Sequence, residues 1–108
     1  MLSRSVLNSV DLYLTEVRKA GIDVQSAIVF GSQAKGTADQ WSDIDLLVIS
    51  PAFDRADSQS LVRILWRLRA FTDSRIEPIP CGSLEWAQPL SVRPIVEIAR
   101  KEGVEVAA

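Results

Sequence analysis

The sequence contains no histidine and a single cysteine, Cys81. Without histidine, the protein cannot build a His-based zinc site, a histidine-activated nucleophile or an imidazole proton shuttle. A single cysteine excludes an internal disulfide. Any chemistry must therefore come from carboxylates, hydroxyl groups, lysine, arginine and backbone amides.

The chain also lacks a large excess of either charge and any long apolar run. Its 12 basic and 14 acidic residues give a formal net charge of -2, which argues against nucleic-acid binding by bulk charge alone. The N-terminal segment has no apolar signal core and no small-residue cleavage site, and no later stretch is apolar enough to span a bilayer. We therefore expect a cytoplasmic protein with no membrane partner.

Apolar residues recur every three or four positions in some segments and form short continuous runs in others, which distinguishes helices from strands. The expected helices cover 2–20, 58–71 and 92–103. The expected strands cover 26–31, 43–50, 74–82 and 104–107. With 47% hydrophobic residues, this order predicts one domain over residues 1–108 with an α/β (α+β) fold: a small mixed sheet with helices packed on it.

Two local patterns add detail to this fold. The apolar stripe of the second helix is expected to be buried, and it consists of Leu61, Ile64, Leu65, Leu68 and Phe71. Pro78 and Pro80 remove two backbone donors from the third strand, so we expect this strand at an edge of the sheet.

The stretch "VFGSQAKGTADQWSDIDLLVIS", from Val29 to Ser50, places a polar loop between two strands. Asp43 and Asp45 are two residues apart at the start of the second strand, so their side chains point the same way, with Cα atoms roughly 6 to 7 Å apart. Two neighbouring carboxylates repel each other unless a cation lies between them. A hard cation such as Mg²⁺ is the natural partner.

The other end of the loop has the residues of an anion-binding turn. Gly31 and Ser32 directly follow a strand, where the missing side chain lets the backbone approach a phosphate and the hydroxyl adds a donor. Lys35 adds a positive charge, and Gly36 lets the chain turn again. A phosphate-binding turn close to a metal-binding carboxylate pair predicts phosphoryl or nucleotidyl transfer.

Each half of this pattern alone has an ordinary structural explanation. A Gly-Ser pair is a common turn, and an Asp-x-Asp at a strand start is often a cap or a solvated edge. The pattern is neither a Walker A motif, since it lacks the Gly-Lys-Ser/Thr ending, nor a dinucleotide-binding fingerprint. When both halves occur together between two apolar strands, a functional site is a better explanation than two unrelated structural features.

The segment "GSQAKGTADQWSDIDLLV" resembles the signature of the DNA polymerase β-like nucleotidyltransferase superfamily, and the short chain resembles its minimal nucleotidyltransferase (MNT) domains. This resemblance implies that Gly31 and Ser32 hold the nucleoside triphosphate and that Asp43 and Asp45 ligate Mg²⁺, in a site with two metal ions. Ser42 completes the usual Ser-Asp-Ile-Asp form next to the nucleotide. Lys35 and Gly36 are expected in the same nucleotide-binding loop.

Members of this family normally add a third acidic residue from a later strand. Glu77 is the first candidate, because it points opposite to Ile76 on the third strand; Asp73 is the alternative, and a lost third position is the remaining option. Such a carboxylate would activate the attacking hydroxyl or hold the second metal ion. Many minimal members carry arginine where this chain has Gln33 and Lys35, so one forked phosphate contact is missing.

The resemblance implies an Mg²⁺-dependent transfer of NMP, most readily AMP from ATP, to a hydroxyl group of a protein partner. Stand-alone MNT proteins are often encoded beside a HEPN-domain RNase toxin and act as its antitoxin, in some cases by AMPylation of a tyrosine of the toxin. Two alternatives stay open: a weak or inactive subunit that neutralises a HEPN toxin by binding, and a transferase for a small molecule such as an antibiotic. A templated polymerase is not expected, whereas a homo- or hetero-oligomer is compatible with each reading.

Two tryptophans are candidates for contact with a partner. Trp66 lies beside Arg63 and Arg67 off the apolar stripe of its helix, and Trp41 lies in the loop before the aspartates. Aromatic and arginine side chains are enriched at the centres of interfaces. Both tryptophans have an equally ordinary role in packing against their own chain.

Overall fold

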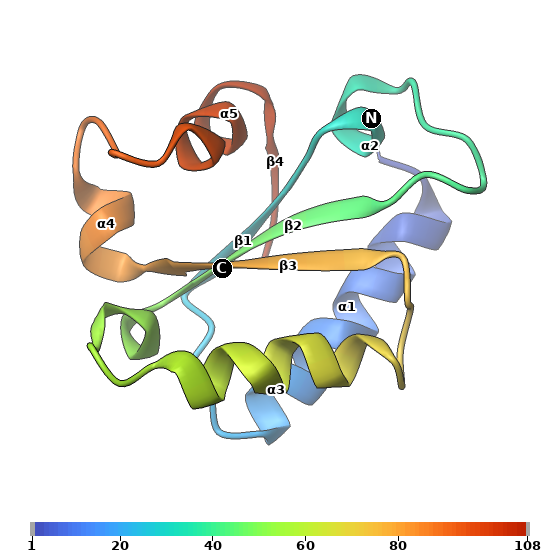
Figure 1. Cartoon of the computed structure of the whole chain (residues 1–108). Helices are drawn as coiled ribbons and strands as arrows, with labels where there is room; N and C mark the ends of the chain where they lie inside the picture. Colours follow the sequence, from blue (N-terminus) through green and yellow to red (C-terminus); the bar gives the residue numbers. More distant parts are fainter. Residues whose placement is uncertain (1, 108) are drawn as a thin grey trace.

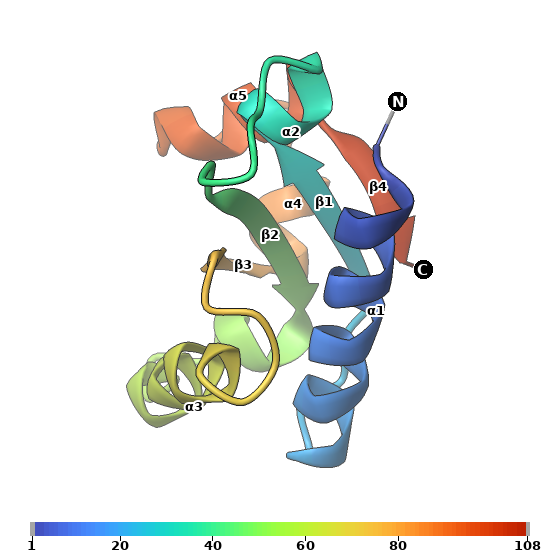
Figure 2. The same ribbon diagram turned by 90° about the vertical axis from the view of Figure 1, so that its right-hand side faces the viewer.

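In the computed structural model, which describes residues 2–107, a four-stranded mixed sheet lies between two sets of helices (Figures 1 and 2). The helices are α1 (Arg4–Lys19), α2 (Ser32–Lys35), the 3₁₀ helix η1 (Pro51–Asp54), α3 (Gln59–Arg69), α4 (Ser83–Ala87) and α5 (Pro94–Glu102). The strands are β1 (Ser26–Phe30), β2 (Ile44–Ser50), β3 (Ile76–Gly82) and β4 (Val104–Ala107). The predicted α+β architecture is confirmed, and α2, η1 and α4 are additional short elements.

The strands have the order β3-β2-β1-β4 across the sheet. β1 runs antiparallel to both β2 and β4, whereas β2 and β3 are parallel. A parallel pair needs a crossover connection, and α3 supplies it between β2 and β3. β3 lies at an edge, as its prolines predict: Pro78 and Pro80 are two residues apart, so both withhold their donors from the same side of the strand.

One face of the sheet is covered by α1 and α3 (Figure 2). α1 begins at Ser3, whose hydroxyl accepts a hydrogen bond from the backbone N–H of Val6 at 3.1 Å. The hydroxyl of Tyr13 donates to the carbonyl of Leu65 in α3 at 2.8 Å, which satisfies a fully buried phenol and joins the two helices. Burial also raises the pKa of Tyr13 far above its usual value, so this group stays protonated.

The expected burial of Phe71 is wrong. This side chain is 77% exposed, whereas Leu65 of the same predicted stripe is fully buried. The reason is that α3 ends at Arg69 and Ala70 is its C-terminal cap, so the helical period no longer directs the side chain of Phe71 toward the sheet.

The opposite face of the sheet is covered by α4 and α5 (Figure 1). Its apolar cluster consists of the buried Ile28, Phe30, Leu47, Ile49, Cys81, Val96 and Ala99. Arg93, just before α5, donates to both carboxylate oxygens of Glu85 in α4 at 2.8 and 2.7 Å and to the carbonyl of Pro80 at 2.8 Å. These bonds hold α4 and the start of α5 against the edge strand β3.

Within residues 2–107, no helix has the length and apolarity that crossing a bilayer requires.

Candidate active site

The turn after β1 is pressed against a carboxylate of β2. Gly31 has φ 73° and ψ -149°, a backbone conformation that is essentially restricted to glycine. A Cβ atom at this position would overlap the Oδ2 atom of Asp45 and lie 3.3 Å from its Cγ atom. The structure therefore brings the predicted phosphate-binding turn, Gly31 and Ser32, into direct proximity with one predicted metal ligand.

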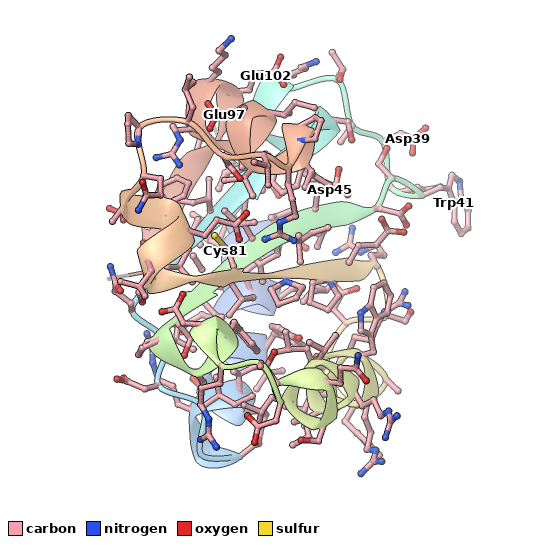
Figure 3. All side chains as sticks on the ribbon, turned by 60° about the vertical axis from the view of Figure 1, so that its left-hand side comes forward. Asp39, Trp41, Asp45, Cys81, Glu97 and Glu102 are labelled. Atoms are coloured by element: carbon pink, nitrogen blue, oxygen red, sulfur yellow. The ribbon has the colours of Figure 1, made fainter. Side chains whose placement is uncertain are left out.

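The parallel pairing of β2 and β3 brings a second carboxylate to Asp45. Asp45 is in register with Glu77 on β3, and residues in register on neighbouring strands, about 4.8 Å apart, present their side chains on the same face. Asp43 lies directly before β2, two residues ahead of Asp45. Asp45 and Glu77 thus lie on neighbouring strands near the start of β2 and of the edge strand β3, with Asp43 just before β2. Figure 3 shows Asp45 next to the loop that carries Asp39 and Trp41.

The carboxylates influence one another's protonation. Partial burial raises the pKa of Asp45, the charge of Asp43 raises it further, and a hydrogen bond with Glu77 opposes the rise. The pKa of Glu77 is raised by burial, by the charges of Asp43 and Asp45, and by its hydrogen bonds with both. Asp45 and Glu77 therefore retain a proton more readily than isolated carboxylates do.

Among residues 2–107, no basic side chain forms an ion pair with Asp43, Asp45 or Glu77, and the ion pairs involve other carboxylates, such as Glu102 and Asp73. Carboxylate oxygens are the ligands that Mg²⁺ prefers, so the donor chemistry at Asp43, Asp45 and Glu77 fits a hard divalent cation. In the described part of the chain, however, no three acidic or cysteine side chains are arranged so that they could hold one metal ion.

Asp73, the alternative third carboxylate, has a different partner. Its Oδ1 atom accepts a hydrogen bond from the backbone N–H of Arg75 at 2.9 Å, and its Oδ2 atom lies 2.8 Å from the Nη2 atom of Arg75. These bonds lower the pKa of Asp73 to about 2. Asp73 closes the turn between α3 and β3, whereas Glu77 lies with Asp43 and Asp45.

Lys35 and Gly36, which are also expected to bind nucleotide, lie at the end of α2. Lys35 forms an ion pair with Glu102 of α5, with 3.4 Å between its Nζ atom and Oε1. Both side chains are largely exposed, so the pair contributes at most about 1 kcal/mol and Lys35 can exchange Glu102 for another anion. Gly36 has φ 75° and ends α2 in the left-handed conformation, which explains a glycine at this position.

Ser42 closes a turn within its own loop. Its hydroxyl accepts a hydrogen bond from the backbone N–H of Asp39 at 3.0 Å and donates to the Asp39 carboxylate at 3.2 Å. The same carboxylate accepts from the backbone N–H of Trp41 at 2.8 Å. This turn holds Trp41 outward, with 81% of the side chain exposed (Figure 3), whereas Trp66 is 42% exposed and stacks with Arg69.

Gln33 lies next to the candidate site, and its structural role was not predicted from the sequence. Its side chain is buried, and its Nε2 atom donates to the carbonyl oxygens of Ser42 and Asp43 at 3.4 and 3.3 Å. The only signal in the sequence is its position directly after Gly31 and Ser32. No periodicity rule applies to a helix of four residues.

Residues 10–103 match the family model of the nucleotidyltransferase domain. A relative from Methanocaldococcus jannaschii is 45% identical, in an alignment that covers 77% of this chain and 70% of that protein; it carries the name "putative protein adenylyltransferase". The chain therefore belongs to the nucleotidyltransferase domain family, and we conclude that it is a nucleotidyltransferase.

The fold is shared with a solved structure of low sequence identity. The crystal structure of a "putative nucleotidyltransferase" from Sulfolobus solfataricus superposes with a TM-score of 0.66 over 94% of this chain and 78% of that chain, at 18% identity. This likeness extends to the architecture of the sheet and helices and confirms the predicted nucleotidyltransferase fold.

Proposed function

We propose that this nucleotidyltransferase transfers AMP from ATP to a hydroxyl group of a protein. The observation that carries the proposal is the β2–β3 register, which sets Glu77 beside Asp45, with Asp43 two residues away and Gly31 pressed against the Asp45 carboxylate. A phosphate-binding turn and a carboxylate group are the two parts that nucleotidyl transfer needs. The name of the Methanocaldococcus relative supports a protein as acceptor.

In this proposal, Asp43, Asp45 and Glu77 would hold Mg²⁺, which, when bound, offsets the negative charge of the triphosphate and of the departing pyrophosphate. Gly31 and Ser32 would bind the phosphates. Lys35 would leave its exposed pair with Glu102 and contribute a positive charge to the same phosphates.

The acceptor hydroxyl would attack the α-phosphorus in line with the leaving group. The bond between the hydroxyl oxygen and the α-phosphorus forms, the bond between the α-phosphorus and the bridging oxygen breaks, and pyrophosphate leaves. Glu77 would orient the hydroxyl and accept its proton, because its register with Asp45 places it beside the other carboxylates of the site.

We further propose that the acceptor is a tyrosine of a HEPN-domain RNase and that the chain acts as the antitoxin of a cytoplasmic toxin–antitoxin pair. The family resemblance of the Gly31-to-Asp45 segment supports this partner. The exposed Trp41 gives additional support, because it projects outward from the loop two residues before Asp43, where an aromatic side chain can contact an incoming protein.

The test is transfer of label from α-labelled ATP, with Mg²⁺, to a HEPN protein encoded beside this chain. Wild type should add the mass of AMP to a tyrosine of the partner, and Asp43→Asn and Asp45→Asn should abolish the addition. Asp11→Asn, which changes an exposed carboxylate on α1, is the matched control and should keep full transfer. If no protein gains AMP while all variants still neutralise the toxin, the chain acts by binding alone.

A further inference from the structure

Gln33 is the buried polar residue of α2. Its side chain is buried, whereas its neighbours Ser32 and Ala34 are partly exposed and Lys35 is exposed. Burying a carboxamide is costly unless its polar atoms find hydrogen-bond partners. The partners of this side chain therefore indicate why a polar residue is kept here.

Both partners of the Gln33 amide lie on the far side of the loop. The Nε2 atom donates to the carbonyl oxygens of Ser42 and Asp43 at 3.4 and 3.3 Å. A carbonyl only accepts hydrogen bonds, so the nitrogen end of the amide must face this pair, and its two hydrogens match the two acceptors. The side chain thus connects the start of α2 to the two residues directly before β2.

The position of Asp43 depends on this connection more than the positions of Asp45 and Glu77 do. Asp45 and Glu77 lie within paired strands, but Asp43 precedes β2, and its side chain is exposed. The turn between Asp39 and Ser42 is closed only by bonds within itself. In residues 37–43, the backbone N–H of Thr37 bonds to the carbonyl of Ser32 at the start of the loop. The two bonds from Gln33 connect the end of the loop, at Ser42 and Asp43, to the phosphate-binding turn.

We infer that Gln33 is a positioning residue, which fixes the backbone of Asp43 relative to Gly31 and Ser32 so that the Asp43 carboxylate and the phosphate-binding turn face one nucleotide. The inference rests on the proposed role of Asp43 as a metal ligand. Residues that orient metal ligands typically change metal affinity or activity by about 10- to 100-fold when they are replaced. A small displacement of a metal ligand misaligns the group to be transferred, so it lowers the reaction rate more than it weakens binding of the nucleotide.

The variant that isolates this role is Gln33→Met, which keeps a similar length and removes the donor. We expect a loss of about 10- to 100-fold in kcat and a similar rise in the Mg²⁺ concentration needed for half-maximal rate. The KM for ATP should change by less than about threefold, because the phosphate-binding turn is retained. Gln33→Lys, which restores a donor on a flexible side chain, should recover part of both losses.

Two further measurements separate positioning from folding. Hydrogen exchange of the Asp43 and Ile44 amides should be faster in Gln33→Met than in wild type, while exchange in β1 and α1 stays unchanged. Gln40→Met, an exposed replacement in the same loop, should leave exchange, kcat and Mg²⁺ dependence at wild-type values.

The outcomes distinguish this inference from the proposed function. If wild type transfers no nucleotide, the exchange measurement and calorimetric titration with Mg²⁺ still test whether Gln33 positions Asp43. The inference is overturned if Gln33→Met keeps the wild-type exchange at Asp43 and the wild-type Mg²⁺ affinity. It is equally overturned if Gln33→Met loses activity only through a lower melting temperature and Gln33→Lys recovers nothing.

Discussion

The carboxylate of Asp45 occupies the space in which a side chain at Gly31 would begin. Gly31 lies between β1 and α2 as the N-terminal cap of α2, while Asp45 is paired with the preceding residue, Phe30, across β1 and β2. The antiparallel pairing thus places a loop glycine against a strand aspartate 14 positions later in the sequence. This contact joins the two halves of the proposed active site.

Gly31→Ala should therefore abolish transfer, because the new Cβ atom displaces the Asp45 carboxylate and strains the backbone. Gly36→Ala is the matched control: its φ of 75° also disfavours a side chain, but no atom lies within 4 Å of the new Cβ. Gly36→Ala should lose about 1 to 2 kcal/mol of stability and keep most of its activity. Rates of AMP transfer and melting temperatures measure both effects, and equal activity losses in the two variants would contradict the assigned contact.

Removing the charge of Glu77 should affect kcat differently from removing the charge of Asp73. Glu77→Gln should lower kcat by about 100-fold or more, because the carboxylate beside Asp45 is assigned to the acceptor hydroxyl. Asp73→Asn should change kcat by less than about threefold, since the bonds of Asp73 to Arg75 only close a turn. A larger effect on kcat from Asp73→Asn than from Glu77→Gln would assign the third carboxylate to Asp73.

The ionisation of Asp73 should also make the free energy of unfolding depend on pH in acid. Its pKa in the folded protein is lowered to about 2 from 3.8, so the folded state favours the ionised form, and its side chain is only 15% exposed. This stabilisation is fully present above pH 4 and is lost as the pH falls from about 4 toward 2, with a magnitude of about 2 kcal/mol.

The comparison of wild type with Asp73→Asn isolates this contribution, because the other carboxylates titrate in both proteins. The difference in the free energy of unfolding, measured by urea denaturation, should be largest near pH 6 and shrink toward pH 2. A difference that does not depend on pH would mean that the bridge to Arg75 contributes nothing through charge.

Cys81 should be inert in the folded protein. Its side chain is 1% exposed, and burial, followed by the charge of Glu85, raises the pKa of its thiol to about 11. The rise of about two pKa units leaves roughly 100-fold less reactive thiolate at pH 8 than an ordinary thiol has. Alkylation by iodoacetamide, followed by mass spectrometry, should be slow in buffer and fast in guanidinium chloride, whereas equal rates would show that Cys81 is accessible.

The elements with a clear hydrophobic period could be predicted from the sequence. The stripe of α1 and the apolar runs of β1 and β2 follow directly from side-chain spacing, and Gly103 marks the end of α5. The short helices α2 and α4 have too few residues to show a hydrophobic period. Phe71 is exposed rather than buried because α3 ends at Arg69, before the predicted apolar stripe does.

The candidate site could be predicted only in part. Asp43, Asp45, Gly31 and Ser32 lie in one continuous segment, so local rules are enough to propose them. The placement of Glu77 instead depends on the register between β2 and β3, which are joined through α3. Local sequence does not fix such a long-range pairing, so it could not decide between Glu77 and Asp73. The structure pairs Asp73 with Arg75.

The most direct test of the account is a crystal structure with Mn²⁺ and an ATP analogue whose α- and β-phosphates are joined by a methylene group, which blocks transfer. We predict an anomalous signal from a manganese ion that is bound by Asp43 and Asp45 beside Glu77. The triphosphate should lie at the backbone of Gly31 and Ser32. A metal ion held elsewhere, or a triphosphate remote from this turn, would contradict it.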